Sequence, residues 1–378
     1  MKKIRVVFVS VGYPPNDVGG AEKQCKLQAE HLASLGHDIQ VVTQRFGYLP
    51  VFENINGIKV YRLPRPKQRY FGALIYALNL FVFLVVKSFS FDLIHVHLAN
   101  LQAEIAVISG KIRRKPVHIK IAAGGYIGDI ARTQTVPFLR SNYGIRKADS
   151  VQAISEEIFR ELMELGLSEE TVVKIPNGVL IPGNDELAIA RERTRLDLNL
   201  SEDVVVFLYL GRISTYKGID VLLEAWKLRA TKDNSHLYIV GPVAIDAPYE
   251  IRIDDLDVTF IKGTNIPLDY LAMADVYVSP SLGEGMSNSL LEAMSCEKAI
   301  IATRVGAAEE MIVHNRSGIL IEAGNVTEIK KAIDRLTIDF ETRHEYGTYA
   351  RITVSRYDIK KVIKTLENRY VEILEKKP

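Results

Sequence analysis

Short apolar runs alternate with helix-forming segments along the whole of this chain. In its first half, runs of the length of a buried strand occupy residues 4–10, 38–43, 58–63, 92–97, 117–122 and 150–154. A helix is predicted after the first run, over residues 21–35, and Gly36 ends it. This alternation is typical of a parallel sheet with helices on both faces.

The second half repeats the pattern. Its predicted strands and helices cover residues 204–211, 219–229, 237–241, 258–261, 276–279, 289–295 and 299–303. Between the halves, residues 175–184 are rich in Pro, Gly and Asn, as linkers are. A chain of 378 residues is also long for one hydrophobic core. We therefore predict an α/β protein with two Rossmann-like domains and an interdomain cleft, in which ligands bind beyond the carboxyl ends of the strands.

The composition is that of a soluble enzyme in a reducing compartment. Hydrophobic residues make up 47% and charged residues 25% of the chain, as in ordinary globular proteins. Cys25 and Cys296 lie far apart and away from other metal ligands, so we predict free thiols. The apolar run after Met1 is too short for a signal peptide and suits a buried first strand. These features predict a cytoplasmic protein.

Charge is distributed unevenly between the halves. Residues 1–176 hold 23 Lys and Arg against 15 Asp and Glu, a balance of +8, and the rest hold 25 against 31, a balance of −6. A basic first half suits an anionic surface or an anionic acceptor. Charges scattered over solvated faces would give the same balance. No nucleic-acid partner is predicted.

Residues 71–86 form a mostly apolar segment of sixteen residues. As a helix it would be about 24 Å long, which is short of the roughly 30 Å hydrocarbon core of a bilayer. The segment is therefore either a buried helix or a helix that dips into a membrane face. The second interpretation draws support from the cations that precede it: Lys59, Arg62, Arg65, Lys67 and Arg69.

Two glutamates, Glu284 and Glu292, flank the start of a predicted helix. On one helix they would be about 12 Å apart along the axis, whereas the paired carboxyls of a glycosidase lie at most about 9.5 Å apart. Ser287 and Asn288 are good N-caps, so Glu284 belongs to the preceding loop. The N–H groups of Met286 to Asn288 would bind a diphosphate, with Glu284 on sugar hydroxyls and Glu292 on ribose hydroxyls. The alternative is a solvated loop acid followed by an unrelated helix acid.

Arg212 and Lys217 follow a predicted strand at its carboxyl end. Breaking a sugar–phosphate bond leaves negative charge on the diphosphate, and two fixed cations can stabilise that charge where other enzymes use a metal ion. The acidic stretch at 254–257 precedes a predicted strand, and we interpret it as surface. We expect no metal and no cofactor. An ordinary charged turn is the alternative.

Two further motifs belong to the first half. Gly19 and Gly20 open the first predicted helix, where small residues allow a ligand to approach the backbone, although a plain turn would look the same. The G-x-G-x-x-G motif of NAD-dependent dehydrogenases is absent there. His95 and His97 point to one face of a strand, and without a third ligand we expect a structural or acceptor-side role.

Together these motifs resemble those of the retaining family-4 glycosyltransferases, which have the GT-B fold. The resemblance covers nearly the whole chain. It rests on Gly19-Gly20, residues 92–97 (D-L-I-H-V-H), 151–155 (V-Q-A-I-S), 176–179 (P-N-G-V), Gly211-Arg212 with Lys217-Gly218, and 284–294 (E-G-M-S-N-S-L-L-E-A-M).

The resemblance implies a role for each matching residue. Arg212 and Lys217 would hold the donor diphosphate during catalysis, and Glu284 would touch the transferred sugar. The donor-binding set would be Gly19, Gly20, Gly263 near the base, Gly285, Met286, Ser287, Asn288, and Glu292 on the ribose. Residues 1–180 would bind the acceptor and residues 181–355 the nucleotide sugar. The last helix, within residues 356–378, would cross back onto the first domain.

The chain departs from the family pattern at one position. Relatives often carry a His that contacts the donor sugar at the end of the strand 117–122, and Ala122 stands there. His118 lies in the strand body and is a poor substitute. The sugar would then be held differently, by the Gly124-Gly125 loop, Lys120 or Asp129. With His97, Lys120 and Asp129 form the candidate acceptor side.

The resemblance implies a metal-independent, retaining transfer of a hexose from a nucleotide-diphosphate sugar, most simply a UDP-sugar. The acceptor would be a glycan or a lipid-linked molecule of polysaccharide biosynthesis. The protein would be cytoplasmic, with peripheral association on the inner membrane face. A non-catalytic sugar-nucleotide-binding protein and a nucleotide-sugar epimerase remain alternatives.

Overall fold

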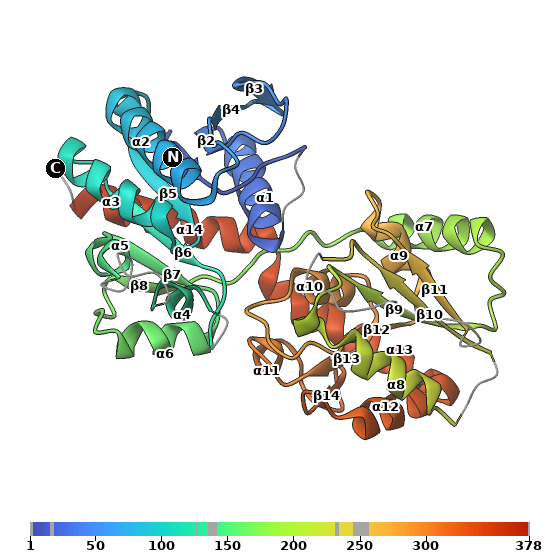
Figure 1. Cartoon of the computed structure of the whole chain (residues 1–378). Coiled ribbons are helices and arrows are strands. Elements are labelled where there is room, and N and C mark those ends of the chain that lie inside the picture. The colour runs from blue at the N-terminus through green and yellow to red at the C-terminus, as the bar shows by residue number, and fades with distance from the viewer. Residues whose placement is uncertain are drawn as a thin grey trace. The chain divides into compact units, whose positions relative to one another are not determined.

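The computed structural model of the chain describes residues 3–15, 19–125, 128–134, 142–230, 234–244 and 257–376. The chain forms two compact units (Figure 1): unit 1 combines Met1–Gly178 with Ile359–Pro378, and unit 2 is Val179–Asp358. The expected domain ends at residues 180 and 355 compare with observed ends at 178 and 358.

Unit 1 is built, within the described residues, on an eight-stranded sheet of order β3-β4-β2-β1-β5-β6-β7-β8. Neighbouring strands are parallel except in the hairpin β3–β4. The strands are β1 (Arg5–Val9), β2 (Asp38–Gln44), β3 (Phe52–Ile55), β4 (Ile58–Leu63), β5 (Leu93–His97), β6 (Val117–Ile121), β7 (Ser150–Ala153) and β8 (Val172–Lys174).

Helices cover both faces of this sheet. On one face, Leu32 of α1 and Tyr370 of α14 share a buried cluster with Phe8 of β1. On the other face, α3 packs so closely that a Cβ on Gly110 would lie 2.6 Å from Cγ2 of Val117. The helices are α1 (Gly20–Ser34), α2 (Arg69–Val86), α3 (Leu101–Arg113), α4 (Asp129–Gln134), α5 (Tyr143–Lys147), α6 (Glu156–Glu164) and α14 (Ile359–Lys376).

Unit 2 has, within the described residues, a six-stranded parallel sheet of order β11-β10-β9-β12-β13-β14. Its core is apolar and includes the buried Trp226 beside Phe207. The strands are β9 (Val205–Leu210), β10 (Ser235–Val240), β11 (Val258–Ile261), β12 (Val276–Ser279), β13 (Ala299–Thr303) and β14 (Ile319–Ile321). The helices are α7 (Asn184–Asp197), α8 (Ile219–Lys227), α9 (Pro267–Met273), α10 (Asn288–Ser295), α11 (Ala308–Met311), α12 (Val326–Ile338) and α13 (Phe340–Val354).

Every strand expected from an apolar run is present, with its ends within two residues of the expected ones. The predicted linker is free of helix and strand up to Gly183, because β8 ends at Lys174 and α7 begins at Asn184, the last residue of the predicted range. Three strands had no prediction: β3, β8 and β14. Each has only three or four residues and lies outside the apolar runs of the sequence analysis, so pairing with a neighbouring strand defines it.

The last helix of the chain belongs to unit 1 rather than unit 2, and the red α14 lies with the blue and green elements of unit 1 (Figure 1). It begins after a 3-10 turn, Ser355–Tyr357, and its buried face includes Ile363 and Leu366. Glu367 on this face is buried and its Oε1 lies 3.1 Å from Nε2 of His37. Both cysteines are buried free thiols, as predicted.

Candidate functional site

The carboxyl end of β9 carries the first predicted cation, Arg212. The hydroxyl of Tyr209 donates to the carbonyl oxygen of Arg212 at 2.8 Å and fixes the chain just beyond the strand. Gly211 precedes Arg212 and lies against the end of β10: a Cβ on Gly241 would be 1.8 Å from the Gly211 carbonyl oxygen. The two glycines therefore let the strand ends approach, and the Arg212 side chain is exposed beyond them.

The loop after β12 leads into α10 as the motif predicts. Ser287 is the N-cap, and its hydroxyl oxygen accepts a hydrogen bond from the Leu290 N–H at 3.4 Å. Gly285 and Met286 are buried, and Asn288 is half-buried at the first position of the helix. The first turn of α10 therefore presents backbone N–H groups, which favour an anion, at the carboxyl edge of the sheet.

A neighbouring loop holds this turn from the side. The Ala307 N–H donates to the carbonyl oxygen of Gly285 at 2.8 Å. Gly306 has a φ of 54°, and a Cβ there would lie 2.2 Å from the same oxygen. Because L side chains rarely adopt this backbone conformation and no space remains for one, only glycine fits at Gly306. The loop after β13 thus fixes the backbone just before α10.

Lys217 and Glu284 form an ion pair between Nζ and Oε1. The lysine ends a 3-10 turn, Thr215–Lys217, and the next residue, Gly218, has a φ of 63°. A Cβ on Gly218 would lie 2.1 Å from the carbonyl oxygen of Pro280, so this turn sits directly on the end of β12. The two side chains are 25% and 19% exposed, which leaves the pair accessible from solvent. One predicted cation and one predicted carboxylate are thus brought together.

Two buried phenols surround this pair, and the sequence reasoning missed both. Burial and the nearby Tyr277 and Glu284 raise the pKa of Tyr209 well above its usual value. Burial and then the charge of Glu284 raise the pKa of Tyr277 as well. Both hydroxyls therefore stay protonated and act as donors. The available signal was a tyrosine near the carboxyl end of each strand: Tyr209 is two residues before Gly211, and Tyr277 is two residues before the end of β12.

Glu292 lies in the second turn of α10 and is half-buried. Its charge, like that of Glu284, raises the pKa of Tyr277, so both carboxylates lie near one phenol at β12. Gly263 follows β11 at the same edge of the sheet, with a φ of 90° and its Cβ position 3.9 Å from Pro242. The predicted residues of unit 2 thus gather at the carboxyl ends of its strands, where a doubly wound sheet binds its ligands.

The remaining candidates belong to unit 1. Gly19 is the N-cap of α1 and Gly20 is its first residue. His97 ends β5 and stacks on His95, with ring centroids 4.4 Å apart, so the two imidazoles share a face as predicted. Lys120 pairs in register with His97 and is 1% exposed. Burial lowers the pKa of Lys120 to about 7 and that of His97 well below its usual value.

Asp129 fixes the turn after β6. Its buried Oδ2 accepts from the N–H of Ala122 at 2.7 Å and from the N–H of Ala123 at 3.3 Å, and burial raises its pKa. The adjoining loop is held by Glu161, whose Oε1 accepts from the Gly125 N–H at 2.5 Å. His118 is fully buried in β6, and burial lowers its pKa to about 3. The position of the usual family histidine therefore holds a small residue in a tightly bonded turn.

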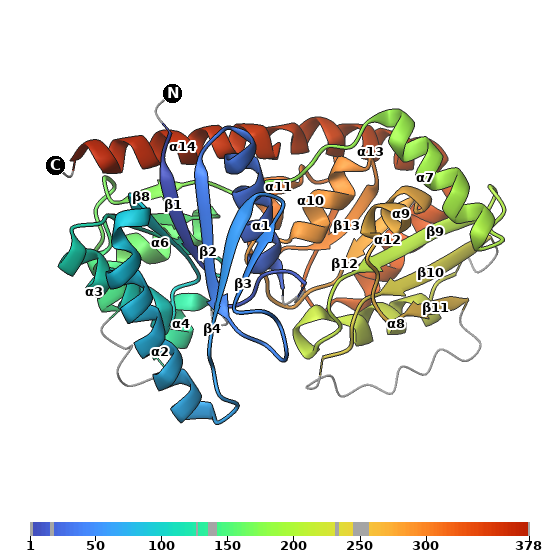
Figure 2. The same ribbon diagram turned by 90° about the horizontal axis from the view of Figure 1, so that it is seen from above.

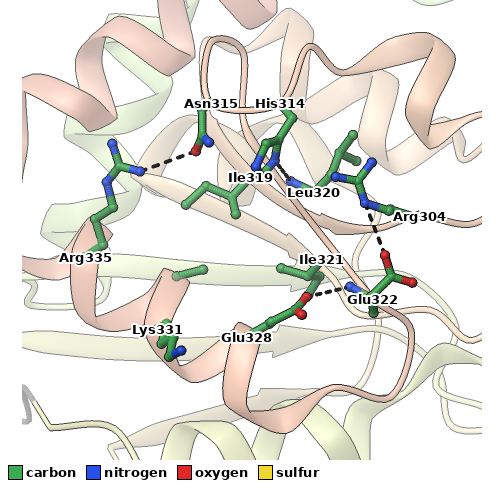
Figure 3. Close-up of a pocket in the computed structure, with 11 residues that line it drawn as sticks. Arg304, His314, Asn315, Ile319, Leu320, Ile321, Glu322, Glu328, Lys331 and Arg335 are labelled. Carbon is green, nitrogen blue, oxygen red and sulfur yellow. Dashed lines mark hydrogen bonds and ion pairs between the residues drawn. The ribbon is translucent and has the colours of Figure 1, made fainter.

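Two other features of the described residues carry no site. They hold no group of three or more His, Cys, Asp or Glu placed to bind a metal, and Asp254 and Asp255 of the acidic stretch lie outside the described ranges. A pocket of about 370 Å³ lies over β14 and α12 (Figure 3). Its polar side chains bond one another, as Arg304 does to Glu322 at 3.3 Å. None of the predicted donor-site residues lines it.

Sequence profiles of known families match both halves of the chain. Residues 18–180 match the profile described as "Glycosyltransferase Family 4", and residues 190–353 match "Glycosyl transferases group 1". The two matches together account for most of the chain. The protein belongs to glycosyltransferase family 4. This glycosyltransferase has the GT-B fold that the sequence motifs imply.

Full-length similarity to curated glycosyltransferases agrees with the profiles. The chain is 27% identical to an uncharacterized glycosyltransferase of Methanocaldococcus jannaschii, over 98% of this chain and 99% of the relative. It is 26% identical to N-acetyl-alpha-D-glucosaminyl L-malate synthase of Bacillus anthracis, over 96% of both chains. It is 25% identical to the capsular polysaccharide biosynthesis glycosyltransferase CapM of Staphylococcus aureus, over 72% of this chain and 74% of the relative.

A solved structure shows the same fold. Anabaena HepE, crystallised in complex with UDP and glucose, superimposes with a TM-score of 0.81 at 19% identity, over 98% of this chain and all of HepE. At that identity the likeness concerns the fold alone. For this glycosyltransferase the roles of individual site residues stay predictions, which the geometry above makes testable.

Proposed function

We propose that this glycosyltransferase transfers a hexose, with retention of anomeric configuration, from a UDP-sugar to a glycan or lipid-linked acceptor. The reaction proceeds without a metal ion or cofactor, on the cytoplasmic side of the membrane and in polysaccharide biosynthesis. Unit 2 binds the nucleotide sugar and unit 1 binds the acceptor. The observation that carries the proposal is the Lys217–Glu284 pair beside the start of α10.

The donor diphosphate would occupy the region between the end of β9 and α10. Arg212 and Lys217 supply two cations there, and the N–H groups of the first turn of α10 supply donors. A diphosphate competes with Glu284 for Lys217, since both are anions. Once Lys217 turns to the phosphate, the Glu284 carboxylate is available to accept hydrogen bonds from the sugar hydroxyls. Glu292, one helical turn further on, takes the ribose hydroxyls.

Retention follows from attack on the same face as the leaving group. The bond between the anomeric carbon and the β-phosphate oxygen breaks, the acceptor oxygen bonds to that carbon, and the acceptor proton passes to the phosphate oxygen. The leaving UDP is therefore also the base. The two cations stabilise the charge that develops on it, which is the largest single contribution in many enzymes.

The similar proteins support this choice of substrates. HepE was crystallised with UDP and glucose, and CapM is a capsular polysaccharide biosynthesis glycosyltransferase. The first supports a UDP-hexose as donor, and the second supports a polysaccharide-type acceptor. The basic character of the first half of the chain suits an acceptor that carries phosphate.

The test compares Arg212→Ala and Lys217→Ala with the wild-type protein. A screen of UDP-, GDP- and ADP-sugars by thermal shift first identifies the donor, because a ligand that binds the native state raises its melting temperature. We expect each variant to lower kcat by roughly 10²-fold, the effect of losing one charge-stabilising donor. Lys227→Ala removes an exposed lysine from the end of α8 and is the matched control.

The same assay separates the alternatives. Transfer with the anomeric configuration retained, read by NMR of the product, supports the proposal, as does full activity in EDTA. Conversion of the donor without an acceptor would indicate an epimerase. Donor binding with neither transfer nor hydrolysis would indicate a non-catalytic binding protein. Near-normal turnover in both cation variants would remove the assigned roles of Arg212 and Lys217.

A further inference from the structure

Helix α2 has apolar side chains on both of its faces. The inner face includes Tyr76, Leu80 and Leu84, which are at most 2% exposed and pack onto unit 1. The outer face carries residues that are between 48% and 78% exposed: Phe71, Leu74, Leu78, Val82, Val86 and, in the following turn, Phe89. A surface helix of a soluble protein normally turns polar residues outward. The outer face of α2, defined by these six side chains, is therefore unexplained by the packing of unit 1.

The size of this face is unusual for a surface in water. Six side chains that are about half or more exposed leave on the order of 500 Å² of contiguous apolar area, the upper range for a soluble monomer. Helix α3 lies beside α2 in both views (Figures 1 and 2), and its Ile108 and Ile112 are 39% and 56% exposed. We call the outer face of α2 the apolar strip, since its six side chains belong to one helix and the turn that follows it.

Cations border this strip at both ends. Arg65 and Lys67 precede α2, and Pro66 between them packs on its first turn, as its carbonyl oxygen would lie 2.0 Å from a Cβ on Gly72. At the other end, Nε of Arg113 donates to the hydroxyl of Ser88 at 2.8 Å, which brings the basic end of α3 to the end of α2. The basic rim, as we define it, consists of the exposed Arg65, Lys67, Lys87, Lys111 and Arg114.

Acidic groups are missing from the segment that carries the strip. Residues 57–91 contain no Asp or Glu. Within the described ranges, no residue of the basic rim forms an ion pair with a carboxylate. A partner for this face must therefore be apolar in the middle and anionic at its edges. A bilayer that contains anionic lipids has both properties, since its acyl chains lie below a layer of phosphate groups.

The helix is long and apolar enough to span a bilayer by length and composition alone. Its place in the sheet argues against that. Helix α2 connects β4 to β5, and both strands belong to one continuous sheet, separated only by β2 and β1. A span would place the two ends of α2 on opposite sides of the membrane and would pull the sheet apart. It would also strip the inner face from the core of unit 1.

We propose that the outer face of α2 and the basic rim form a membrane-docking surface that lies in the interface of a bilayer containing anionic lipids. The six apolar side chains enter the boundary between headgroups and acyl chains, and the rim cations contact lipid phosphates. This docking does not depend on the proposed reaction. If the reaction is as proposed, the surface would hold unit 1, the acceptor unit, where a lipid-linked acceptor resides.

The experiment measures binding of the full-length protein to vesicles by flotation, with phosphatidylcholine alone and with 30% phosphatidylglycerol added. We expect binding to the anionic vesicles that weakens as salt is raised. Leu74→Glu combined with Leu78→Glu should lower the partition coefficient at least tenfold. The matched control is Leu196→Glu on α7, because Leu196 is 69% exposed against 67% for Leu74.

A second measurement reports depth. The chain has one tryptophan, Trp226, which is fully buried in unit 2. A Leu78→Trp variant therefore adds a reporter against a constant background, and we expect a blue shift and quenching by brominated lipids. A UDP titration of every variant shows that unit 2 is intact, so a failed docking and a failed donor assignment give different results.

Three outcomes would overturn the proposal. The first is that the wild-type protein does not bind anionic vesicles at low salt. The second is that the double variant and the Leu196→Glu control bind the vesicles equally well. The third is a stable oligomer that the Leu74→Glu/Leu78→Glu change dissociates without any effect on lipid binding, which would make the outer face a contact between copies of the chain.

Discussion

Glu284 has two expected partners, Lys217 in the structure and the donor sugar in the proposed complex, and a Glu284→Gln variant separates them. If the donor diphosphate binds Lys217 as proposed, UDP must displace the carboxylate from Lys217 in the wild-type protein. The variant removes that competition, so UDP alone should bind more tightly. The affinity for a UDP-hexose should rise less than the affinity for UDP, because a neutral amide replaces the carboxylate that accepts hydrogen bonds from the sugar hydroxyls.

The magnitude follows from the exposure of the pair. Fully exposed ion pairs contribute 0–1 kcal/mol, and removing one partner from a fully buried pair costs about 3–5 kcal/mol. The Lys217 and Glu284 side chains are 25% and 19% exposed, so solvent still reaches them. The free energy of their ion pair should therefore lie near the range for exposed pairs. A competition of about 1 kcal/mol corresponds to roughly fivefold tighter binding of UDP. Loss of hydrogen bonds to a charged group costs about 1.5–3 kcal/mol, so the advantage of UDP-hexose over UDP should fall by roughly 10- to 100-fold.

Isothermal titration calorimetry with UDP and with the UDP-hexose found by the donor screen measures both quantities. Glu186→Gln, on the exposed side of α7, makes the same change of charge away from the site and should leave both affinities within twofold. Unchanged or weaker UDP binding in Glu284→Gln, with the advantage of the UDP-hexose preserved, would refute the exchange of partners at Lys217.

Three further changes test other parts of the molecule. Lys120→Met should remove a pH dependence of the free energy of unfolding. The buried amine has a pKa of about 7, against 10.5 in the unfolded chain, so between these pH values the unfolded state binds one proton more than the folded state. Urea unfolding at pH 7 and 9 should show wild-type stability rising relative to the variant by about 1.4 kcal/mol per pH unit, and parallel curves would contradict it. Gly306→Ala should weaken UDP binding several-fold, because its Cβ would displace the Gly285 carbonyl that precedes α10, and an unchanged affinity would show that the loop yields freely. Asn325→Ala should lower the melting temperature by a few degrees, since its side chain caps α12 through the Glu328 N–H at 3.1 Å and such caps contribute about 1 kcal/mol; an unchanged melting temperature would show that this cap contributes nothing.

The placement of the candidate donor-site residues in the fold could be predicted from sequence because the segments that carry them are local. Each of these segments lies where an apolar run stops, so the run itself predicts the strand, and the residues after it fall at the carboxyl edge. Ser287 as N-cap and the loop position of Glu284 are likewise set by neighbours within a few residues. The roles of the matching residues came from the family resemblance, and geometry alone would not have assigned them.

Features that depend on strand register or on distant packing were not predictable in this way. Tyr209 and Tyr277 face Glu284 only because β9 and β12 are neighbours in the sheet although nearly seventy residues apart. The sequence of residues 71–86 does not decide between a buried and an interfacial helix, because a segment that is apolar all round has no periodicity to show which face is covered. The structure covers one face and exposes the other. The buried-helix interpretation therefore holds for the covered face, and membrane contact of the exposed face stays a prediction.

Unit 1 buries several titratable side chains on one face of its sheet, and their protonation states explain how it can do so. The face of β5 and β6 that meets α14 carries His95, His97, His118 and Lys120, all at most 1% exposed, and the Tyr370 hydroxyl of α14 lies 2.5 Å from Nδ1 of His95. Burial lowers the pKa of all three histidines far enough to keep them neutral. The unfolded chain takes up protons at these rings below about pH 6.5, where the folded chain does not. Unit 1 must therefore lose stability as the pH falls through that range.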